Sequence, residues 1–175
     1  MEFSEILSRR RSTRKFNDRK VAGDVVERLL QAAFTAPSAR NARSTRIMVV
    51  DNAETIARMS EMRDYGSGFM KSAPLAFVVA GEPSASGLWR ENAAIAATIL
   101  QLAVVNEGMA SCWVHVDGRP RLQSNPEGEN AEEYLRTLLM LPDNWRVLCV
   151  VAAGYSDFHP ADLPPYDYRT AVLRY

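Results

Sequence analysis

The stretch from Leu88 to Glu107 constrains the fold more than any other part of the sequence. Its pattern predicts a helix that is apolar almost all round, with Gly108 ending it. A helix without a polar face has to be covered on several sides, so we expect it at the centre of the molecule. Its longest apolar run, Ala93 to Val105, is shorter than the ~20 residues that a bilayer-spanning helix needs. The stretch therefore predicts the core helix of a soluble protein.

Short apolar and β-branched runs predict four strands around this helix. The predicted strands cover residues 46–50, 75–80, 112–116 and 147–153. Further helices are predicted over 3–10, from an N-cap at Asp24 to Ala36, over 53–62, and around 134–139. The polar stretch from Asp117 to Glu129 is expected to be a long surface loop. This alternation predicts a mixed three-layer α/β arrangement in a single domain, residues 1–175.

Composition excludes several classes of protein. The chain has 175 residues, of which 47% are hydrophobic and 24% charged, which is ordinary globular usage and excludes disorder, collagen and coiled coil. Lys plus Arg and Asp plus Glu are both 21, so the net charge is zero. Cys112 and Cys149 lie in apolar surroundings without metal-ligand spacing, so we expect reduced cytosolic thiols and no metal site. The first residues lack a secretory pattern, and a cytoplasmic location is expected.

A cluster of basic residues at the exit of the first predicted helix is the first candidate site. Arginine grips phosphate through two parallel hydrogen bonds, and a nearby hydroxyl adds a directional donor. The cluster includes Arg10, Arg11, Ser12 and Arg14. A solvated basic surface is the alternative, and a small nucleic-acid-binding module is a second one. The nucleic-acid alternative is weaker because the rest of the chain offers no further basic stripe or aromatic stacking platform.

Two other segments have the small residues that allow close backbone approach to a flat ligand. They are APSARN, residues 36–41, and GMASCW, residues 108–113. Taken alone, the first is a helix-ending turn, and Trp113 is more often a core residue than a ligand contact. Alternation along a strand puts Cys112 and His115 on opposite faces, so they make a poor catalytic dyad. Neither GxGxxG nor a Walker sequence is present, so dinucleotide-binding and nucleoside triphosphate-binding folds lack support. Because catalytic side-chain constellations are also sparse, we expect a bound cofactor to carry any chemistry.

Taken in order, four motifs resemble the FMN-dependent nitroreductase family. They are RRSTRKF near the start, APSARN, GMASCW after the long apolar helix, and AAGY near the end, so the resemblance covers essentially the whole chain. The resemblance implies an α+β fold with a central mixed sheet, built as an intertwined homodimer with FMN at the subunit interface. It also implies NADH or NADPH as electron donor, a nitroaromatic, quinone or related acceptor, and a ping-pong mechanism through flavin N5.

Site residues follow from matching the motifs position by position. The family's basic segment matches Arg10, Arg11, Ser12 and Arg14, which there contact the flavin phosphate, ribityl chain and pyrimidine edge. The segment that reaches the flavin from the neighbouring subunit matches Pro37, Ser38, Ala39 and Asn41. The stretch beside the isoalloxazine ring matches Trp113, Val114 and His115.

The chain departs from the family pattern in two places. Many members continue the second motif as Asn-x-Gln-Pro-Trp, whereas Asn41 is here followed by Ala42-Arg43-Ser44-Thr45. Members often have proline and then a basic phosphate contact after the late Gly-Tyr, and here Arg169 is the substitute candidate. The aromatic tail, residues 158–175, is expected to pack on the partner subunit. A flavin-binding or flavin-storing protein without turnover is the alternative if residues 43–45 block the pocket.

Overall fold

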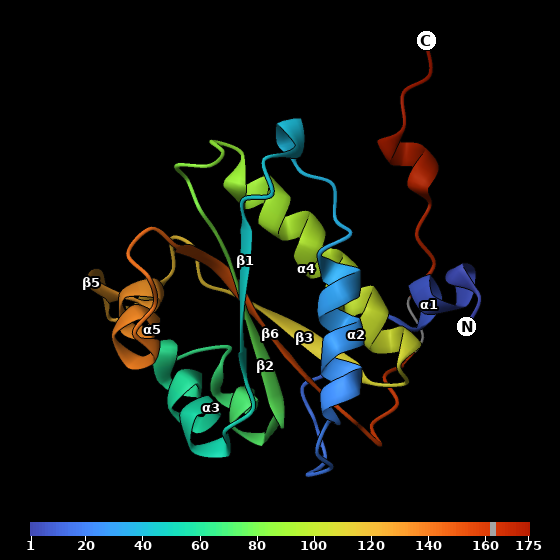
Figure 1. Cartoon of the computed structure of the whole chain (residues 1–175). Coiled ribbons are helices and arrows are strands. Elements are labelled where there is room, and N and C mark those ends of the chain that lie inside the picture. Colours follow the sequence, from blue (N-terminus) through green and yellow to red (C-terminus); the bar gives the residue numbers. More distant parts are fainter. Residues whose placement is uncertain (162–163) are drawn as a thin grey trace.

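A four-stranded sheet forms the centre of the molecule, in the order β1-β2-β6-β3 (Figure 1). The computed structural model describes residues 1–161 and 164–175. The strands are β1 (Thr45–Val50), β2 (Leu75–Gly81), β3 (Ala110–His115) and β6 (Arg146–Gly154). All three ladders are antiparallel. The sequence predicts a mixed sheet, but the four strands are paired only in the antiparallel sense. Among the described residues, parallel pairing is limited to an isolated bridge between Ser12 and Ser111.

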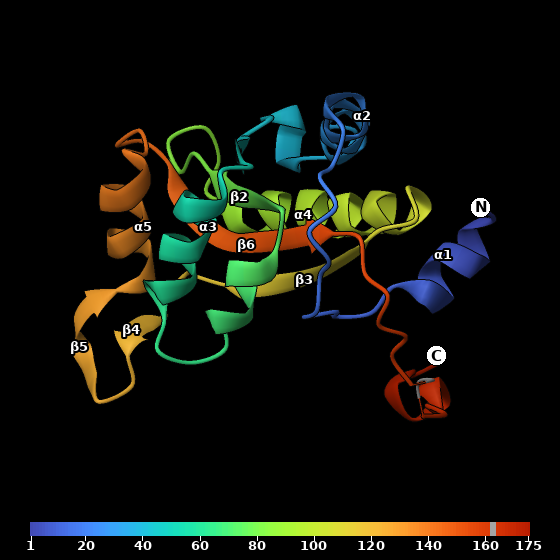
Figure 2. The same ribbon diagram turned by 90° about the horizontal axis from the view of Figure 1, so that it is seen from below.

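Helices cover both faces of this sheet, so the predicted three layers are confirmed (Figure 2). One face packs against α2 (Gly23–Ala33) and α4 (Trp89–Asn106), and the other packs against α3 (Ala53–Met59) and α5 (Ala131–Leu139). Successive residues of a strand point to opposite faces. In β2, Phe77 accordingly faces α4, whereas Ala76 and Val78 face α3 and α5.

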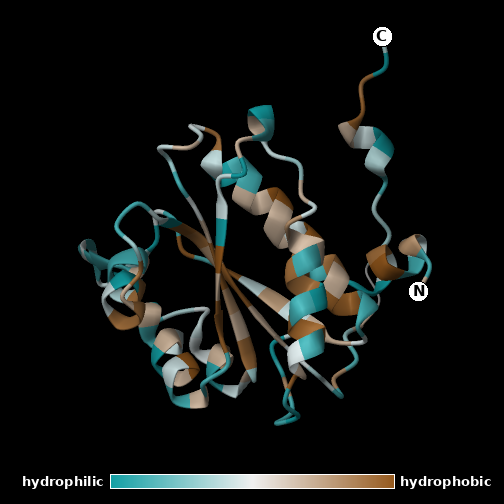
Figure 3. Ribbon diagram, viewed as in Figure 1, coloured by the Kyte–Doolittle hydropathy of each residue, from teal (hydrophilic) through white to brown (hydrophobic). Residues whose placement is uncertain are grey.

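The long apolar helix α4 lies within one residue of its expected bounds. It packs between the sheet and α2, but its outer side is exposed at Ile95, so it is not covered all round as expected. Figure 3 shows that hydrophobic residues concentrate in this helix and the strands, whereas the outer loops are hydrophilic. Gly108 follows with φ +72, and Met109 N–H donates to the Val104 carbonyl over 3.0 Å, which is the turn that ends a helix with glycine. None of the helices in the described ranges is long and apolar enough to cross a membrane.

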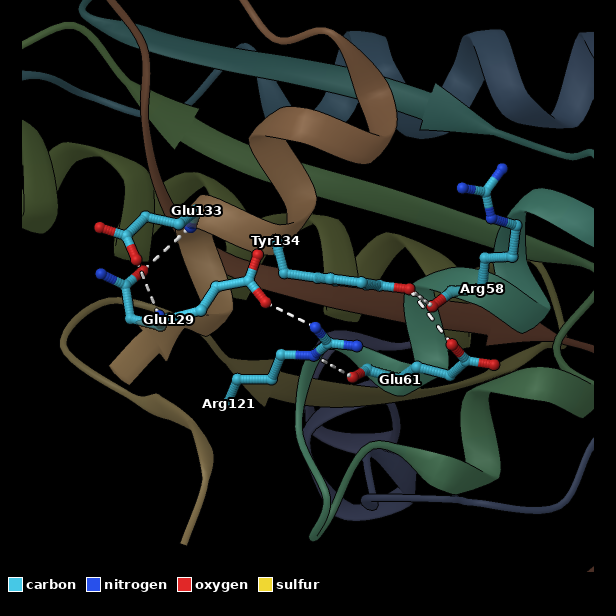
Figure 4. A network of polar contacts seen from close by, with 7 residues as sticks. Arg58, Glu61, Arg121, Glu129, Glu133 and Tyr134 are labelled. Carbon is cyan, nitrogen blue, oxygen red and sulfur yellow. Dashed lines mark hydrogen bonds and ion pairs between the residues drawn. The ribbon is translucent and has the colours of Figure 1, made fainter. Parts of the chain in front are cut away.

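The expected surface loop over 117–129 is wrong, because a polar hairpin occupies most of it. Its strands are β4 (Pro120–Leu122) and β5 (Asn125–Asn130). Figure 4 shows how the hairpin is fixed: the Arg121 guanidinium pairs with Glu129 and donates to the Glu61 carbonyl over 3.3 Å. The same guanidinium lies 4.0 Å from the Tyr134 ring centroid. Polar and cation–π contacts thus replace the alternating apolar pattern that predicts a strand.

Helix starts differ from the predictions for local reasons. Helix α2 begins at Gly23, and Asp24 pairs with Arg28 over 2.8 Å instead of capping the helix. Helix α5 begins three residues before the predicted start, because Asn130 and Glu133 form a reciprocal capping box. The first helix, α1 (Phe3–Arg9), ends one residue early.

The C-terminal arm leaves the body after β6 and extends away from it (Figure 1). A single 3-10 turn, Tyr168–Ala171, interrupts it. The side chains of Leu173 and Tyr175 are fully exposed, although both are apolar or aromatic. Positions 162 and 163 of the expected arm lie outside the described residues.

Candidate functional site

The basic N-terminal segment lies against the open edge of β3. Thr13 N–H donates to the Ser111 carbonyl over 3.0 Å, next to the bridge between Ser12 and Ser111. Further along, Asn17 N–H donates to the Tyr155 carbonyl over 3.0 Å, just beyond β6. Backbone pairing therefore brings two of the motifs predicted from the sequence, the basic segment and the strand after Gly108, side by side.

Alternation divides the basic segment between two sides. Because the segment runs extended beside β3, Arg10, Ser12 and Arg14 point to one side and Arg11 and Thr13 to the other. Burial raises the pKa of the Cys112 thiol, whereas the charges of Arg14 and Arg10 and a hydrogen bond with Ser12 lower it. Arg11 instead lines a cavity of about 590 Å³, whose walls come from the following residues: Ser8, Arg9, Thr13, Gly108, Met109, Ala110, Ser156, Phe158, His159 and Pro160. Arg11 also donates to the Ala161 carbonyl. Within the described ranges, neither Arg10 nor Arg14 makes an ion pair.

The strand residues predicted to lie beside the flavin ring occupy both faces of β3. The rings of Trp113 and His115 stack at 6.2 Å between centroids with 13° between planes, so they share a face as predicted. Val114 points to the other face and is buried in the core under α3 and α5. Burial lowers the pKa of His115, and the nearby charge of Arg119 lowers it further. A neutral imidazole is therefore favoured here at neutral pH.

A segment that the sequence did not single out also borders this site. Arg63 donates to the His115 carbonyl over 3.0 Å, and its guanidinium lies 4.0 Å from the Tyr65 ring centroid. Phe69 lies 5.9 Å from the guanidinium carbon of Arg14. The composition of residues 65–68 predicts only a mobile loop, and these contacts depend on tertiary packing that no local pattern reveals.

The APSARN motif forms a compact loop elsewhere in the molecule. Its 3-10 turn spans Ala39–Asn41, and Pro37, Ser38 and Asn41 line a cavity of about 440 Å³. Ala39 N–H donates to Asn92 near the start of α4, whereas Arg11 lies near Gly108 at the other end of that helix. Asn92 and Gly108 are sixteen positions apart, which is about 24 Å at ~1.5 Å per helical residue. One chain therefore does not bring the two motifs together.

Arg169 lies in the arm, away from the basic segment. Its guanidinium is 5.9 Å from the Tyr168 ring centroid, and its backbone N–H donates to Asp167 over 3.1 Å. The residue is exposed. Within the part of the chain that the structure describes, this candidate phosphate contact is not joined to Arg10 or Arg14.

Comparison with known proteins gives a consistent result. The family model described as the nitroreductase family matches residues 7–63. A curated relative from Archaeoglobus fulgidus, named NADH dehydrogenase/NAD(P)H nitroreductase, is 32% identical over 92% of this chain and 91% of its own. A relative of the same name from Methanothermobacter thermautotrophicus is 29% identical over 95% of this chain and 84% of its own.

Solved structures agree with these relatives. The FMN-dependent nitroreductase of Clostridium difficile R20291 superposes with a TM-score of 0.89 and 33% identity, covering 97% of this chain and 98% of that one. A nitroreductase family protein from Streptococcus pneumoniae shares the fold at a TM-score of 0.82 with 19% identity, covering 99% and 100%. Sequence identity along nearly the full length, together with the shared α+β fold, shows that this chain belongs to the nitroreductase family.

Proposed function

We propose that the protein is an FMN-dependent NAD(P)H oxidoreductase that acts as a homodimer. The observation that carries the proposal is the backbone pairing of the basic segment with β3, whose alternation puts Arg10, Ser12 and Arg14 on one side. Two guanidinium groups without an ion pair in the described ranges, with a hydroxyl between them, fit a ligand that has an anionic end and polar groups along its length. The donor set therefore fits FMN.

Each residue would have a distinct role toward the cofactor. Arg10 would hold the phosphate end, and Ser12 the ribityl chain. Arg14, whose guanidinium lies 5.9 Å from the Phe69 ring centroid, would place positive charge at the pyrimidine edge and so favour the reduced cofactor. Trp113 and His115 would lie beside the ring, with His115 neutral. Arg11, on the other side of the segment, would contribute to the phosphate region through long-range charge rather than through a shared contact with Arg10.

A second subunit would complete the site. Pro37, Ser38, Ala39 and Asn41 are at the opposite end of α4 from the basic segment, so the loop that carries them would reach the flavin of the partner. The arm, 158–175, whose described residues are exposed, would pack on the partner and cover its aromatic residues. Arg169 would then reach the partner's phosphate region.

Bound FMN supplies hydride acceptance from NAD(P)H at N5 and hydride donation to a second substrate. The protein's own residues bind and orient it and set its charge environment, and we assign none of them as a nucleophile. A nitroaromatic, a quinone or a related flat acceptor would use the space vacated by the nicotinamide. The buried cysteines suit a reducing compartment such as the cytoplasm.

The test begins with the purified protein. We expect a yellow protein that releases FMN on denaturation and oxidises NADH or NADPH in the presence of a quinone. Double-reciprocal plots at several acceptor concentrations should be parallel, because one pocket holds donor and acceptor in turn. A yellow protein without turnover would support the flavin-storing alternative, and a colourless protein that apo titration with FMN leaves unchanged would reject the proposal.

A further inference from the structure

A buried amide joins the central helix to the APSARN loop. The Asn92 side chain on α4 is 2% exposed. Its Oδ1 accepts the Ala39 N–H over 2.9 Å, and its Nδ2 donates to Ser44 Oγ over 2.9 Å and to Ser86 Oγ over 3.4 Å. Ser44 is completely buried. One side chain therefore fixes the chain at Ala39, within the APSARN loop, and at Ser44, three residues after Asn41.

The loop between these two points has an unusual backbone. Arg40, Asn41 and Arg43 have φ of 54, 53 and 47°, in the left-handed region that residues other than glycine rarely adopt. Asparagine tolerates this region, but Arg40 and Arg43 adopt it against a steric penalty. Ser38 Oγ also accepts the Arg43 N–H over 2.9 Å, which closes the loop internally. The conformation persists because surrounding hydrogen bonds specify it.

An amide at position 92 is costly for the helix itself. The neighbouring buried positions of α4, Ala93 and Ala96, are apolar, and burying a polar group is unfavourable unless it is hydrogen-bonded. The partners of the Asn92 amide all lie outside α4, in the loop and in the turn before the helix. The amide therefore contributes to the position of the loop rather than to packing of the helix.

We propose that Asn92, with Ser44, is a positioning residue that holds the APSARN loop in the shape in which it meets the flavin. The statement about the flavin rests on the proposed function; the statement about the loop does not. It also gives a reason for the departure from Gln-Pro-Trp after Asn41: Ser44 supplies the hydroxyl that accepts the Asn92 amide N–H. Asn92 does not touch the cofactor in this arrangement and acts through Ala39 and Asn41.

The experiment compares wild type with Asn92→Leu by two independent readouts. The first is limited trypsin digestion, in which mass spectrometry follows cleavage after Arg40 and Arg43, the two arginines between Ala39 and Ser44. The second is the Kd of apo protein for FMN, measured by flavin fluorescence, with the visible circular dichroism of bound flavin as its spectroscopic signature. We expect cleavage in the loop to be about tenfold faster and FMN to bind about tenfold more weakly, as loss of buried hydrogen bonds implies.

Two further variants separate positioning from general destabilisation. Asn92→Asp keeps an oxygen that accepts the Ala39 N–H, and Ser44 can donate to the other oxygen. Burial of the new carboxylate lowers overall stability, but cleavage should be slower and FMN binding tighter than in Asn92→Leu. Leu100→Ala leaves a cavity in the core beside the same helix, far from the loop. It should lower the unfolding temperature while leaving loop cleavage and the flavin circular dichroism unchanged.

The outcomes test the positioning role of Asn92 and the contact between the loop and the flavin separately. If Asn92→Leu is cleaved in the loop no faster than wild type, the positioning role is overturned, whatever happens to FMN. If cleavage rises but FMN affinity and circular dichroism stay as in wild type, the loop does not meet the flavin and that part of the proposal is overturned. If the wild type binds no FMN, the proposed function fails, and the cleavage comparison still decides the role of Asn92.

Discussion

The basic segment and the APSARN loop are held in place by different means. The segment Arg10–Arg14 is fixed by backbone pairing with β3, and Arg10 and Arg14 make no ion pair within the described ranges. The loop is fixed by side chains: Asn92 and Ser44 are buried beneath it, and Ser38 closes it internally. Backbone fixation leaves charges available for a ligand, whereas side-chain fixation specifies a shape.

The segment would therefore contribute charge to a binding site, whereas the loop would contribute shape. In the segment, removing a charge should weaken binding while the backbone stays in place. In the loop, removing a charge should matter little, and changing the conformation should matter more. Substitutions in each region can therefore test the division.

Arg10→Ala should weaken FMN binding by roughly one to two powers of ten. A charge-assisted hydrogen bond contributes about 1.5–3 kcal/mol, and ~1.4 kcal/mol is tenfold in affinity. Titration of FMN into the apo variant measures the effect. Arg9→Ala is the matched control, because Arg9 already pairs with Glu5 over 2.8 Å on the exposed side of α1.

The control should bind FMN like wild type. If Arg10→Ala and Arg9→Ala behave alike, the cluster is a solvated basic surface and the charge role of the segment is rejected. Arg14→Ala sharpens the result: it should also make the bound flavin harder to reduce, since positive charge at the pyrimidine edge is lost. A reduction potential equal to that of wild type would place Arg14 away from the ring.

Deleting residues 163–175 should lower FMN affinity about tenfold. If the loop of one subunit meets the segment of the other, removing the arm weakens the dimer and separates the two. Apolar side chains in the described part of the arm, such as Leu173, are fully exposed and would be covered in the dimer. Analytical ultracentrifugation together with FMN titration measures both effects. A truncated protein that stays dimeric, yellow and equally stable would contradict the role of the arm.

The sequence predicts those parts of the fold that apolar periodicity specifies. The strands β2 and β6 and the helix α4 are continuous apolar runs, and their bounds were predicted within one or two residues. The hairpin β4–β5 was missed because Arg121 and Glu129 stabilise it through polar contacts, which have no period. The capping box at Asn130 and Glu133 is a start signal for α5 that a sequence pattern can reveal.

In the candidate site, too, the sequence predicts the contacts that follow from strand alternation but not those between distant residues. Stacking of Trp113 and His115 follows from strand alternation, so the sequence predicts it. The split of Arg10 from Arg11 follows from the same alternation, once the segment is known to be extended beside β3. The contact of Arg14 with Phe69 and the bond from Ala39 to Asn92 join residues more than fifty positions apart, and no local pattern encodes them.

Arg43→Gly should stabilise the protein by up to about 1 kcal/mol and leave FMN binding unchanged. Glycine adopts the left-handed φ of this position without steric cost, and its greater freedom in the unfolded chain offsets part of the gain. The Arg43 side chain is exposed, and its bond to Asn41 is 3.3 Å long, so losing the charge removes little. Urea denaturation measures the stability. Weaker FMN binding in this variant would show that loop charge matters and would break the division.

The smallest effect should be that of His115→Gln on the pH dependence of the free energy of unfolding. Burial lowers its pKa in the folded state, so the unfolded chain takes up a proton at a higher pH than the folded chain does. The stability that His115 contributes is therefore present above its unfolded pKa of ~6.5 and is lost as the pH falls through the folded pKa.

Wild type should lose more free energy of unfolding between pH 7.5 and 5 than His115→Gln does. His159→Gln changes the other of the two histidines, which is exposed, and should keep the wild-type loss. Equal losses in wild type and His115→Gln would mean that the imidazole titrates alike in both states, and that β3 does not shield it.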